Sequence, residues 1–584
     1  MSKSTAPRLL LLGLVVSHCL WGVASVAAQD GPPDVRFGAV EALRDPVAAA
    51  EADVGWERIL FYWSELQPSG PEEWNGYHVP DIWFQLAGEQ GRQVVGLLKH
   101  TPAWATDGPV GCGVPRGLDL PIDDPGNLWA NFIRRVVGIY AGRVERWIIW
   151  NEPDIVPPTY GYEWCGSMEE YYRLLKVAYL AAHQVSPDVT IHLAGMTTWH
   201  DKTYLRRFLA LAAQDPSGSE HGYYFDVVSL HIYFRTESVP EIINETQATL
   251  AAYGLNKPIW LNETNAPPNS DPQWPMAEAN YDISLEEQAS YLLQSFALAL
   301  SAGAERVAVY KWLDNDLPPG FEPFGLIRPD YSRRPAYDAY RLITTHYAGT
   351  ISAWEDRRSL FTVVTLDRAP LTTRVLWART EAEATVTVPA LASQARLIDQ
   401  TGAEQSIEPV EGQYTVTLPG APCADKRGCI IGGATYLLVE ETSGAAPPTA
   451  TSVPVATATA VITPTGGISP TVSVSPDATA TAPVTASPTS VPPPTETPTQ
   501  TPTATSKPTK TPTATPSSTP TSTPAPSSTP WPSDTPMLPT SPPTPWPAVS
   551  LPAGVSPQSI LIALVSLVAS AVALGVWFRR LNGR

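Results

Sequence analysis

Between residues 33 and 349, short apolar runs alternate with longer amphipathic stretches, a pattern typical of repeated βα units. Most of the short runs are apolar throughout, as expected of parallel strands that are buried on both faces. Helical periodicity is clearest at 127–142, 168–185, 284–303 and 335–347. The eight predicted strands lie at 35–40, 57–63, 93–100, 146–152, 189–195, 225–234, 257–263 and 305–312.

Eight βα units over this length predict an α/β fold, namely a (β/α)8 TIM barrel at 33–349. An open doubly wound sheet is the alternative arrangement of such units. That fold usually carries a glycine-rich phosphate loop after its first strand, and the chain has no such loop there. The barrel is therefore the favoured prediction.

From residue 350 to residue 441 the period changes to the strict alternation of half-buried strands. The stretches are "SLFTVVTLD" at 359–367, "TTRVLWART" at 372–380, "ATVTVPA" at 384–390, "ARLIDQTG" at 395–402, "QYTVTLPG" at 413–420 and "ATYLLVEE" at 434–441. This segment, at 350–441, predicts a small antiparallel β-sandwich.

Both ends of the chain carry apolar runs. Residues 1–28 combine basic residues, an apolar stretch and small residues near position 28, which predicts a cleaved signal peptide. Residues 559–578 are apolar and uncharged, which predicts one transmembrane helix, with a buried helix as the alternative. The arginine-rich tail at 579–584 then predicts a single-pass cell-surface protein whose C-terminus is cytoplasmic.

A segment rich in Pro, Thr and Ser at 445–552 separates the predicted sandwich from the predicted transmembrane helix. A segment of this composition cannot bury a core, and its proline content favours extended conformations. It therefore predicts a disordered stalk, and its hydroxyl-rich composition is typical of O-glycosylated stalks.

Four of the five cysteines lie beyond the predicted signal peptide, as suits an exported chain. The favoured disulfide pairs are Cys112 with Cys165 and Cys423 with Cys429, because the second pair closes a short loop. Metal ligation is the alternative, but no CxxC spacing accompanies these residues. The net charge of −19 argues against a nucleic-acid partner.

Polar side chains gather where the predicted strands end. In a TIM barrel these ends meet on one rim, which carries the functional residues. Two of the strands, the fourth and the seventh, end in an Asn-Glu pair. The strand-end residues are Lys99 and His100, Asn151 and Glu152, His231 and Tyr233, Asn262 and Glu263, and Trp312.

Two carboxylates facing one another across a pocket are what glycosidic bond cleavage requires. Glu152 follows an apolar strand, so partial burial should raise its pKa and keep a proton available for a leaving oxygen. Glu263 must stay ionised, and Tyr233 or His231 could donate hydrogen bonds to it. A Schiff-base role for Lys99 would indicate a lyase instead, but that role leaves the two glutamates unexplained.

The motifs "WNEP" at 150–153 and "PIWLNETN" at 258–265 resemble those of the retaining glycoside hydrolases of the (β/α)8 clan A. This resemblance implies that Glu152 is the acid/base, that Glu263 is the nucleophile and that Asn151 binds the sugar 2-hydroxyl. It also implies substrate or nucleophile contacts for His231 and Tyr233, and places Trp312 beneath the sugar. No metal or organic cofactor is implied.

Three further stretches, at 62–75, 100–105 and 324–340, resemble glycoside hydrolase family 39 and its relatives. In those families a comparable domain follows the barrel and braces it, which implies a bracing role for the segment at 350–441. A separate carbohydrate-binding module is the alternative, for which few suitable aromatic residues are present. One departure is that the second strand ends in Trp63, Ser64 and Glu65, where many clan members have an arginine near the nucleophile. Arg36 and Arg58 are the possible substitutes. This departure keeps open a second function class, an inactive barrel that binds glycan on the cell surface.

Aromatic residues are frequent in the predicted βα loops, where their faces can stack on sugar rings. The leading prediction is a membrane-anchored, extracellular retaining glycoside hydrolase that acts on a poly- or oligosaccharide with β-linked sugars. His100, Lys99 and Trp63 are additional candidate substrate contacts. The loop tryptophans are Trp63, Trp104, Trp164, Trp199 and Trp274.

Overall fold

The computed structural model of the chain describes residues 31–155, 163–275, 281–315, 323–423 and 428–442. Eight parallel strands of this part form one sheet in the order β5-β4-β3-β2-β1-β8-β7-β6. Their bounds are β1 Phe37–Val40, β2 Trp56–Tyr62, β3 Gln93–Lys99, β4 Arg146–Asn151, β5 Thr190–Gly195, β6 Val228–Tyr233, β7 Ile259–Asn265 and β8 Arg306–Val309. All eight overlap the strands that the sequence predicts.

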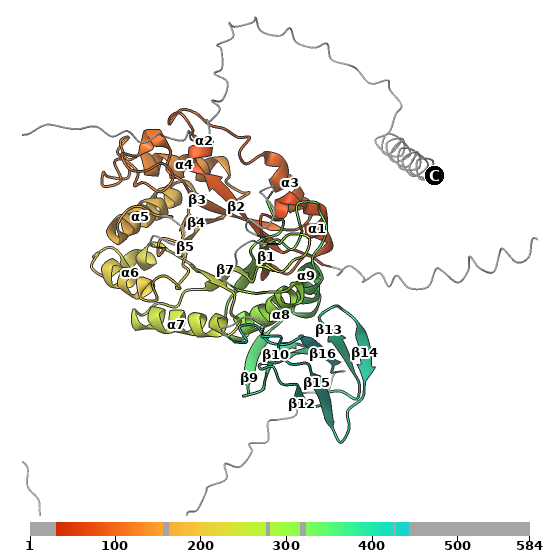
Figure 1. Cartoon of the computed structure of the whole chain (residues 1–584). Coiled ribbons are helices and arrows are strands. Elements are labelled where there is room, and N and C mark those ends of the chain that lie inside the picture. The colour runs from red at the N-terminus through yellow and green to blue at the C-terminus, as the bar shows by residue number, and fades with distance from the viewer. Residues whose placement is uncertain (1–30, 156–162, 276–280, 316–322, 424–427, 443–584) are drawn as a thin grey trace, which may run out of the picture. The chain divides into compact units, whose positions relative to one another are not determined.

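The two edges of this sheet meet, so the strands form a barrel (Figure 1). Parallel bridges join His192 to Val227 and Met196 to Leu230, across the gap between β5 and β6. Backbone hydrogen bonds of 2.9 and 3.1 Å accompany them, from Leu193 N to Val227 O and from Met196 N to Ser229 O. The predicted (β/α)8 barrel is confirmed, and the open sheet is excluded.

Helices surround the barrel and begin at capping residues that the sequence supplies. Ser167 and Glu170 form a capping box at the start of α5, and Ser284 and Glu287 form one at the start of α8. The α-helices of the described residues are α1 Pro46–Glu51, α2 Trp63–Leu66, α3 Asp81–Glu89, α4 Leu128–Ile139, α5 Met168–Val185, α6 Tyr204–Ala212, α7 Ser238–Ala252, α8 Leu285–Ser301 and α9 Pro335–His346.

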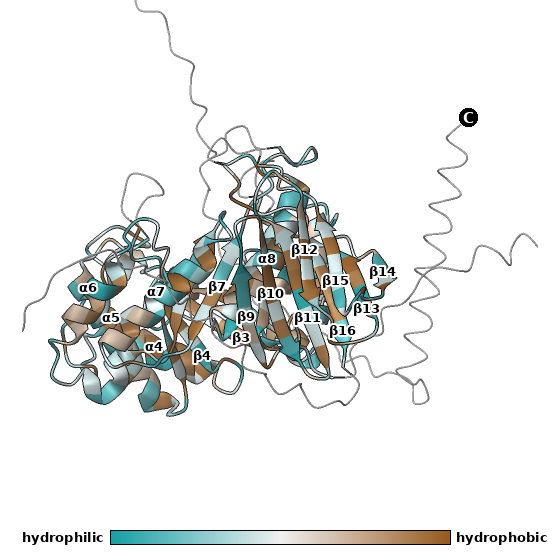
Figure 2. Ribbon diagram, turned by 90° about the horizontal axis from the view of Figure 1, so that it is seen from below, coloured by the Kyte–Doolittle hydropathy of each residue, from teal (hydrophilic) through white to brown (hydrophobic). Residues whose placement is uncertain are grey.

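After the barrel, the chain forms antiparallel sheets, and in β12 and β15 hydrophobic and hydrophilic residues alternate along the strand (Figure 2). Six strands pair in the order β14-β13-β16-β11-β10-β9, and β12 pairs with β15. Their bounds are β9 Ser352–Arg357, β10 Phe361–Arg368, β11 Leu371–Ala378, β12 Ala384–Pro389, β13 Ala395–Asp399, β14 Glu404–Ile407, β15 Gln413–Leu418 and β16 Tyr436–Glu441. The predicted antiparallel segment is confirmed.

Two strands, β9 and β14, were not among those that the alternation predicts. They are the edge strands of the six-stranded sheet, and their residues are mostly exposed. Edge strands need no second buried face, so the hydrophobic alternation that identifies the other strands is weak in these two.

Helix α8 is buried around most of its circumference, because the C-terminal sheets cover the face that points away from the barrel. Ser290 Oγ donates a hydrogen bond of 2.6 Å to Gln400 Oε1. Gln294 Nε2 donates to Gly433 O at 3.0 Å, and Gln294 Oε1 accepts from Gly432 N at 3.0 Å. These buried contacts support the bracing role for the C-terminal sheets.

The two predicted disulfides, Cys112–Cys165 and Cys423–Cys429, are both present. The predicted signal peptide at 1–28, stalk at 445–552, transmembrane helix at 559–578 and tail at 579–584 lie outside the described residues. Among the helices of the described ranges, none combines the length and the apolar character needed to cross a membrane.

The contact between α8 and the C-terminal sheets can be tested with Gln294→Ala. This change leaves the buried Gly433 O and Gly432 N without these partners, so we expect the free energy of unfolding to fall by about 2–4 kcal/mol. Urea unfolding measures this loss. The control is Gln85→Ala on the exposed face of α3, expected to change stability by less than about 0.5 kcal/mol. Equal losses in the two variants would contradict a bracing contact at α8.

Candidate active site

Glu152 is the first residue after β4, and its backbone turns out of the strand. Its φ of +40° lies in the left-handed region, and its N–H donates to Gly195 O at 3.0 Å. The side chain is 16% exposed and lies on the rim where the barrel strands end. The neighbouring Asn151 closes β4 and has a buried Oδ1 that no described residue hydrogen-bonds. The Asn151 side chain also lines the cavity beside Glu152.

Glu263 lies inside β7, two residues before the strand ends, and is only 4% exposed. Both of its oxygens accept hydrogen bonds from charged or hydroxyl donors. Arg58, in the middle of β2, donates to Oε1, and the Tyr233 hydroxyl, at the end of β6, donates to Oε2. Glu263 is therefore held as an ionised carboxylate by donors from two other strands.

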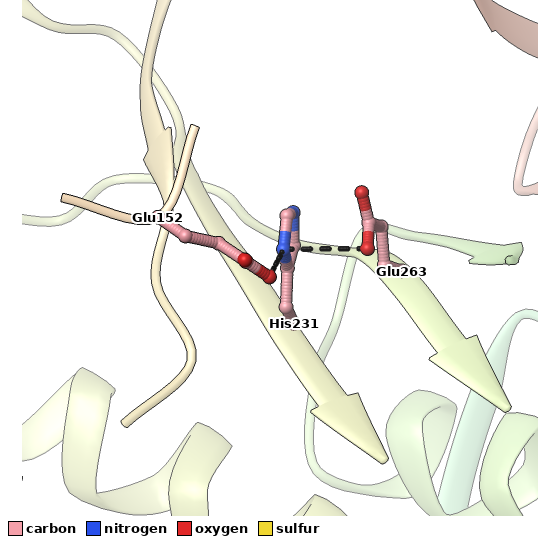
Figure 3. A group of neighbouring side chains, drawn as sticks. All are labelled: Glu152, His231 and Glu263. Atoms are coloured by element: carbon pink, nitrogen blue, oxygen red, sulfur yellow. Dashed lines mark hydrogen bonds and ion pairs between the residues drawn. The ribbon is translucent and has the colours of Figure 1, made fainter. Parts of the chain in front are cut away.

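His231 on β6 lies between the two glutamates (Figure 3). Its Nδ1 is 2.6 Å from Glu152 Oε1 and 3.4 Å from Glu263 Oε2. One atom of each side chain, a carboxylate oxygen or the ring nitrogen, lies within 4.8 Å of the corresponding atoms of the other two. The imidazole is fully buried, so it holds the carboxylates at this separation.

The two carboxyl groups have opposite environments. Burial raises the pKa of Glu152 above its ordinary value, and the negative charges of Glu263 and Glu163 contribute in the same direction, although the hydrogen bond from His231 opposes them. Burial also acts to raise the pKa of Glu263, but Arg58, His231 and Tyr233 outweigh it and lower that pKa. Such a pair combines one group that holds a proton with one that stays charged.

Among the described residues, Glu152, His231 and Glu263 lie close enough together that their side chains could hold a metal ion. Their donor atoms are already engaged with one another and with Arg58 and Tyr233. The positive charge beside Glu263 also disfavours a bound cation. The arrangement therefore suits acid–base chemistry better than metal binding.

A cavity of about 1320 Å³ opens above the two carboxyl groups. Of the residues predicted from the sequence, Lys99, Asn151, Glu152, Tyr233 and Glu263 line it. Its walls also contain many rings, as expected of a site for sugars. The aromatic lining residues are Tyr62, His78, Trp83, Trp199, His200, Phe234, Tyr281, Tyr310, Phe324 and Tyr331.

Four residues of the predicted site do not line this cavity: Trp63, His100, His231 and Trp312. His231 contacts Glu152 and Glu263 instead. Trp63 is fully buried, stacks on Phe132 and donates its Nε1–H to Gln67. Trp312 is also fully buried, with its Nε1–H bonded to Asp45 O at 3.2 Å. Both side chains point into the packing around the barrel, so they cannot stack on a sugar.

His100 stacks on Tyr62, with ring centroids 4.3 Å apart, and lies behind the ring that lines the cavity. The prediction that His100 contacts the substrate is therefore not supported. At the end of β8, the ring that reaches the cavity is that of Tyr310, two residues before Trp312. Of the predicted loop tryptophans, Trp199 lines the cavity and is 46% exposed.

Of the two arginines named as possible substitutes, Arg36 and Arg58, it is Arg58 that contacts the predicted nucleophile. Its guanidinium reaches Glu263 from the middle of β2, inside the barrel, and not from the strand end, where sequence reasoning looked for it. A signal was present, since Arg58 is the only basic residue of an otherwise largely apolar strand. Gly195 also went unnoticed; an added Cβ there would lie 1.9 Å from His231 Nε2.

Solved structures of glycoside hydrolases share this fold. A family 39 glycoside hydrolase from the gut symbiont Bacteroides cellulosilyticus WH2 matches with a TM-score of 0.53 and 17% identity, over 70% of this chain and 81% of that one. At this identity the likeness shows the fold, and it confirms the predicted structural resemblance to family 39.

Two other solved structures match with lower scores. A family 39 β-xylosidase from Caulobacter crescentus has a TM-score of 0.48 and 15% identity, over 70% of this chain and 97% of its own. A family 30 endoxylanase from Clostridium papyrosolvens C71 has a TM-score of 0.48 and 11% identity, with the same coverage. No protein-family model and no curated protein sequence matches the chain.

The packing of His231 can be tested with Gly195→Ala. The added Cβ overlaps the buried imidazole, so we expect the free energy of unfolding to fall by about 1–3 kcal/mol. Chemical unfolding of both proteins measures this change. Gly138→Ala is the matched control, because a Cβ there meets Val185 at 3.5 Å, an ordinary contact on α4. Wild-type stability in Gly195→Ala would show that His231 is free to move.

Proposed function

We propose that this chain is a retaining glycoside hydrolase in which Glu152 is the general acid/base and Glu263 is the nucleophile. The observation that carries this proposal is the pair of carboxyl groups with opposite pKa shifts, whose oxygens come within 4.8 Å of each other on one rim of the barrel. Retaining enzymes hold these groups about 5–5.5 Å apart, whereas inverting enzymes separate them by about 6.5–9.5 Å to admit a water.

In the first step, Glu263 attacks the anomeric carbon of the bound sugar. The bond from that carbon to the glycosidic oxygen breaks, and Glu152 transfers its proton to the departing oxygen. Before the attack, hydrogen bonds from Arg58 and Tyr233 stabilise the negative charge of Glu263. These hydrogen bonds weaken as the carboxylate oxygen bonds to carbon. The product of this step is a glycosyl ester on Glu263 and a free alcohol.

In the second step, Glu152 is ionised and removes a proton from water. The water oxygen attacks the anomeric carbon, the bond to Glu263 breaks, and both carboxyl groups return to their starting states. Two inversions at one carbon retain its configuration. The fully buried His231 keeps both groups in place through the cycle.

A carbohydrate substrate is supported by the cavity itself. Aromatic rings on its walls can stack on sugar faces, and Asn151, which lines the cavity beside Glu152, carries an amide that can hydrogen-bond a sugar hydroxyl. A volume of about 1320 Å³ exceeds that of most sites for single small molecules, which span about 300–1,000 Å³. We therefore propose an oligo- or polysaccharide substrate, with β-linked sugars.

The place of action proposed is the outer cell surface. The two disulfides of the described residues favour an oxidising compartment. The apolar run at 559–578 and the proline-rich segment at 445–552 would then serve as membrane anchor and spacer. The inactive-barrel alternative loses its main support, because Arg58 fills the position that seemed to be empty.

The catalytic assignment predicts different effects for two substitutions. Glu263→Ala removes the nucleophile and should reduce kcat by at least about 10⁴-fold on every substrate. Glu152→Gln should slow release of poor leaving groups by about 10²–10⁴-fold, but affect activated aryl glycosides much less, because those need little protonation. Rates of sugar release from a panel of aryl glycosides and polysaccharides measure both.

The purified chain should be used, with Glu287→Gln as a matched control, since this buried glutamate caps α8 away from the cavity. NMR of the first-formed product should show the anomeric configuration of the substrate. Inversion would refute the double displacement. No release from any substrate, with glycan binding unchanged in both variants, would refute the enzyme.

Tyr233→Phe tests what keeps Glu263 ionised. Losing the hydroxyl donor should raise the pKa of Glu263, so the acid limb of the kcat/KM profile should move to higher pH by about one unit. Activity would therefore be lost earlier as the pH falls. Tyr179→Phe on α5, outside the cavity lining, is the control. An unmoved acid limb in Tyr233→Phe would show that Arg58 and His231 suffice.

A further inference from the structure

A second charged pair lines the cavity near Glu152. Lys99, the last residue of β3, is 6% exposed, and its ammonium group pairs with the carboxylate of Glu163. Glu163 belongs to the segment between β4 and α5, and 31% of its side chain is exposed. Both residues line the same cavity as Asn151 and Glu152.

Covalent and backbone contacts hold this pair from behind. Thr101 and Gly111 exchange backbone hydrogen bonds of 3.0 and 2.9 Å, which fold the segment after Lys99 back toward Cys112. The disulfide joins Cys112 to Cys165, and Cys165 N also donates to Cys112 O at 2.9 Å. Lys99 and Glu163 are therefore the facing ends of a ring that the disulfide closes.

Glu163 has one more anchor close to the proposed acid. Trp150 Nε1, two residues before Glu152, donates to the backbone oxygen of Glu163 at 2.7 Å. The position of Glu163 is thus fixed by the disulfide and by β4 without any use of its carboxylate. An ion pair with a nearly buried lysine costs desolvation and adds little to a connection that a covalent bond already makes.

We propose that Lys99 and Glu163 form a binding pair for hydroxyl groups of the sugar next to Glu152, and that the Cys112–Cys165 disulfide holds the pair in position. This inference rests on the proposed glycosidase function and assigns two specificity residues to its site. The ligand class is a neutral sugar whose hydroxyl groups can accept from the ammonium and donate to the carboxylate.

The chemistry of the pair suits such a ligand. A sugar hydroxyl is both donor and acceptor, so it can bridge an ammonium and a carboxylate without requiring a net charge on the sugar. Hydrogen bonds to charged groups are stronger than those between neutral groups, and each changes binding by roughly 10- to 100-fold. A sugar that lacks the bridging hydroxyl should therefore be a poor substrate.

The pair also acts on Glu152 through its charges. The carboxylate of Glu163 is one of the groups that raise the pKa of Glu152, and Lys99 partly neutralises that carboxylate by pairing with it. The other charged or titratable groups around Glu152 are His231 and Tyr233 on β6 and Glu263 on β7, with Arg58 of β2 behind Glu263.

Two substitutions should therefore move the alkaline limb of the kcat/KM profile in opposite directions, since Glu152 must be protonated to act as an acid. Glu163→Gln removes a negative charge, lowers the pKa of Glu152 and should move this limb to lower pH. Lys99→Met leaves Glu163 uncompensated and should move it to higher pH. The control is Asp107→Asn, the same loss of charge on an exposed residue of the β3–α4 loop outside the cavity lining, for which no shift is expected.

Deoxy analogues of the best aryl glycoside test hydroxyl binding. In the wild type, removing the recognised hydroxyl should reduce kcat/KM by about 10- to 100-fold, and in Lys99→Met or Glu163→Gln this penalty should nearly vanish. Lys99→Arg, which keeps the charge, should retain part of the penalty. Cys112→Ser/Cys165→Ser keeps both charges, and it should reduce the penalty because the loops can separate.

The outcomes separate the two proposals. No sugar release by the wild-type chain would refute the glycosidase and the binding pair together. Release by the wild type, with an unmoved alkaline limb in Glu163→Gln and an undiminished hydroxyl penalty, would overturn the binding pair alone. An undiminished penalty in the double serine variant would overturn the role of the disulfide. Because Glu163 is partly exposed, Glu163→Gln decides the matter even if Lys99→Met unfolds.

Discussion

The buried contact between Arg58 and Glu263 is the constraint on which the site depends. A carboxylate that is only 4% exposed would lose its charge without a cation beside it, because burial of an isolated charge is very costly. In the sheet, β1 and β8 separate β2 from β7, so this pair spans the barrel interior. The barrel must close with both side chains pointing inward, and closure itself therefore creates the anionic group that the chemistry needs.

The other half of the site follows from the same geometry. His231 reaches one carboxylate at each side of β6, and Gly195 on β5 leaves the space that its ring occupies. Among the described residues no arginine pairs with Glu152, so burial dominates its environment and raises its pKa despite the opposing hydrogen bond and charge of His231. Two chemically identical groups thus have opposite environments, one that favours the protonated form and one that favours the anion.

Sequence reasoning located the strands, the main helices, the disulfides and the two glutamates, because each leaves a local signal: a period, a spacing or a strand end. It failed where the role of a residue depends on the direction in which its side chain points. Trp63 and Trp312 end predicted strands but lie beyond the observed ends of β2 and β8, and their rings point into the packing around the barrel. Arg58 instead points inward from mid-strand. A shift of one residue along a strand reverses the face, and only the closed barrel decides which face meets the cavity. Lys99 and Glu163 lie close together because the Cys112–Cys165 disulfide joins their loops. The spacing of residues along the sequence does not show which side chains such a disulfide brings into contact.

The burial of α8 has a consequence for how the chain is made. A ribosome completes the barrel strands well before residues 400–435, which hydrogen-bond to Ser290 and Gln294. During that interval Ser290 and Gln294 of α8 lack these partners. The last strand of the described residues, β16, runs between β11 and β13 and so completes that sheet. The cover over α8 is thus finished only after β16 has been synthesised.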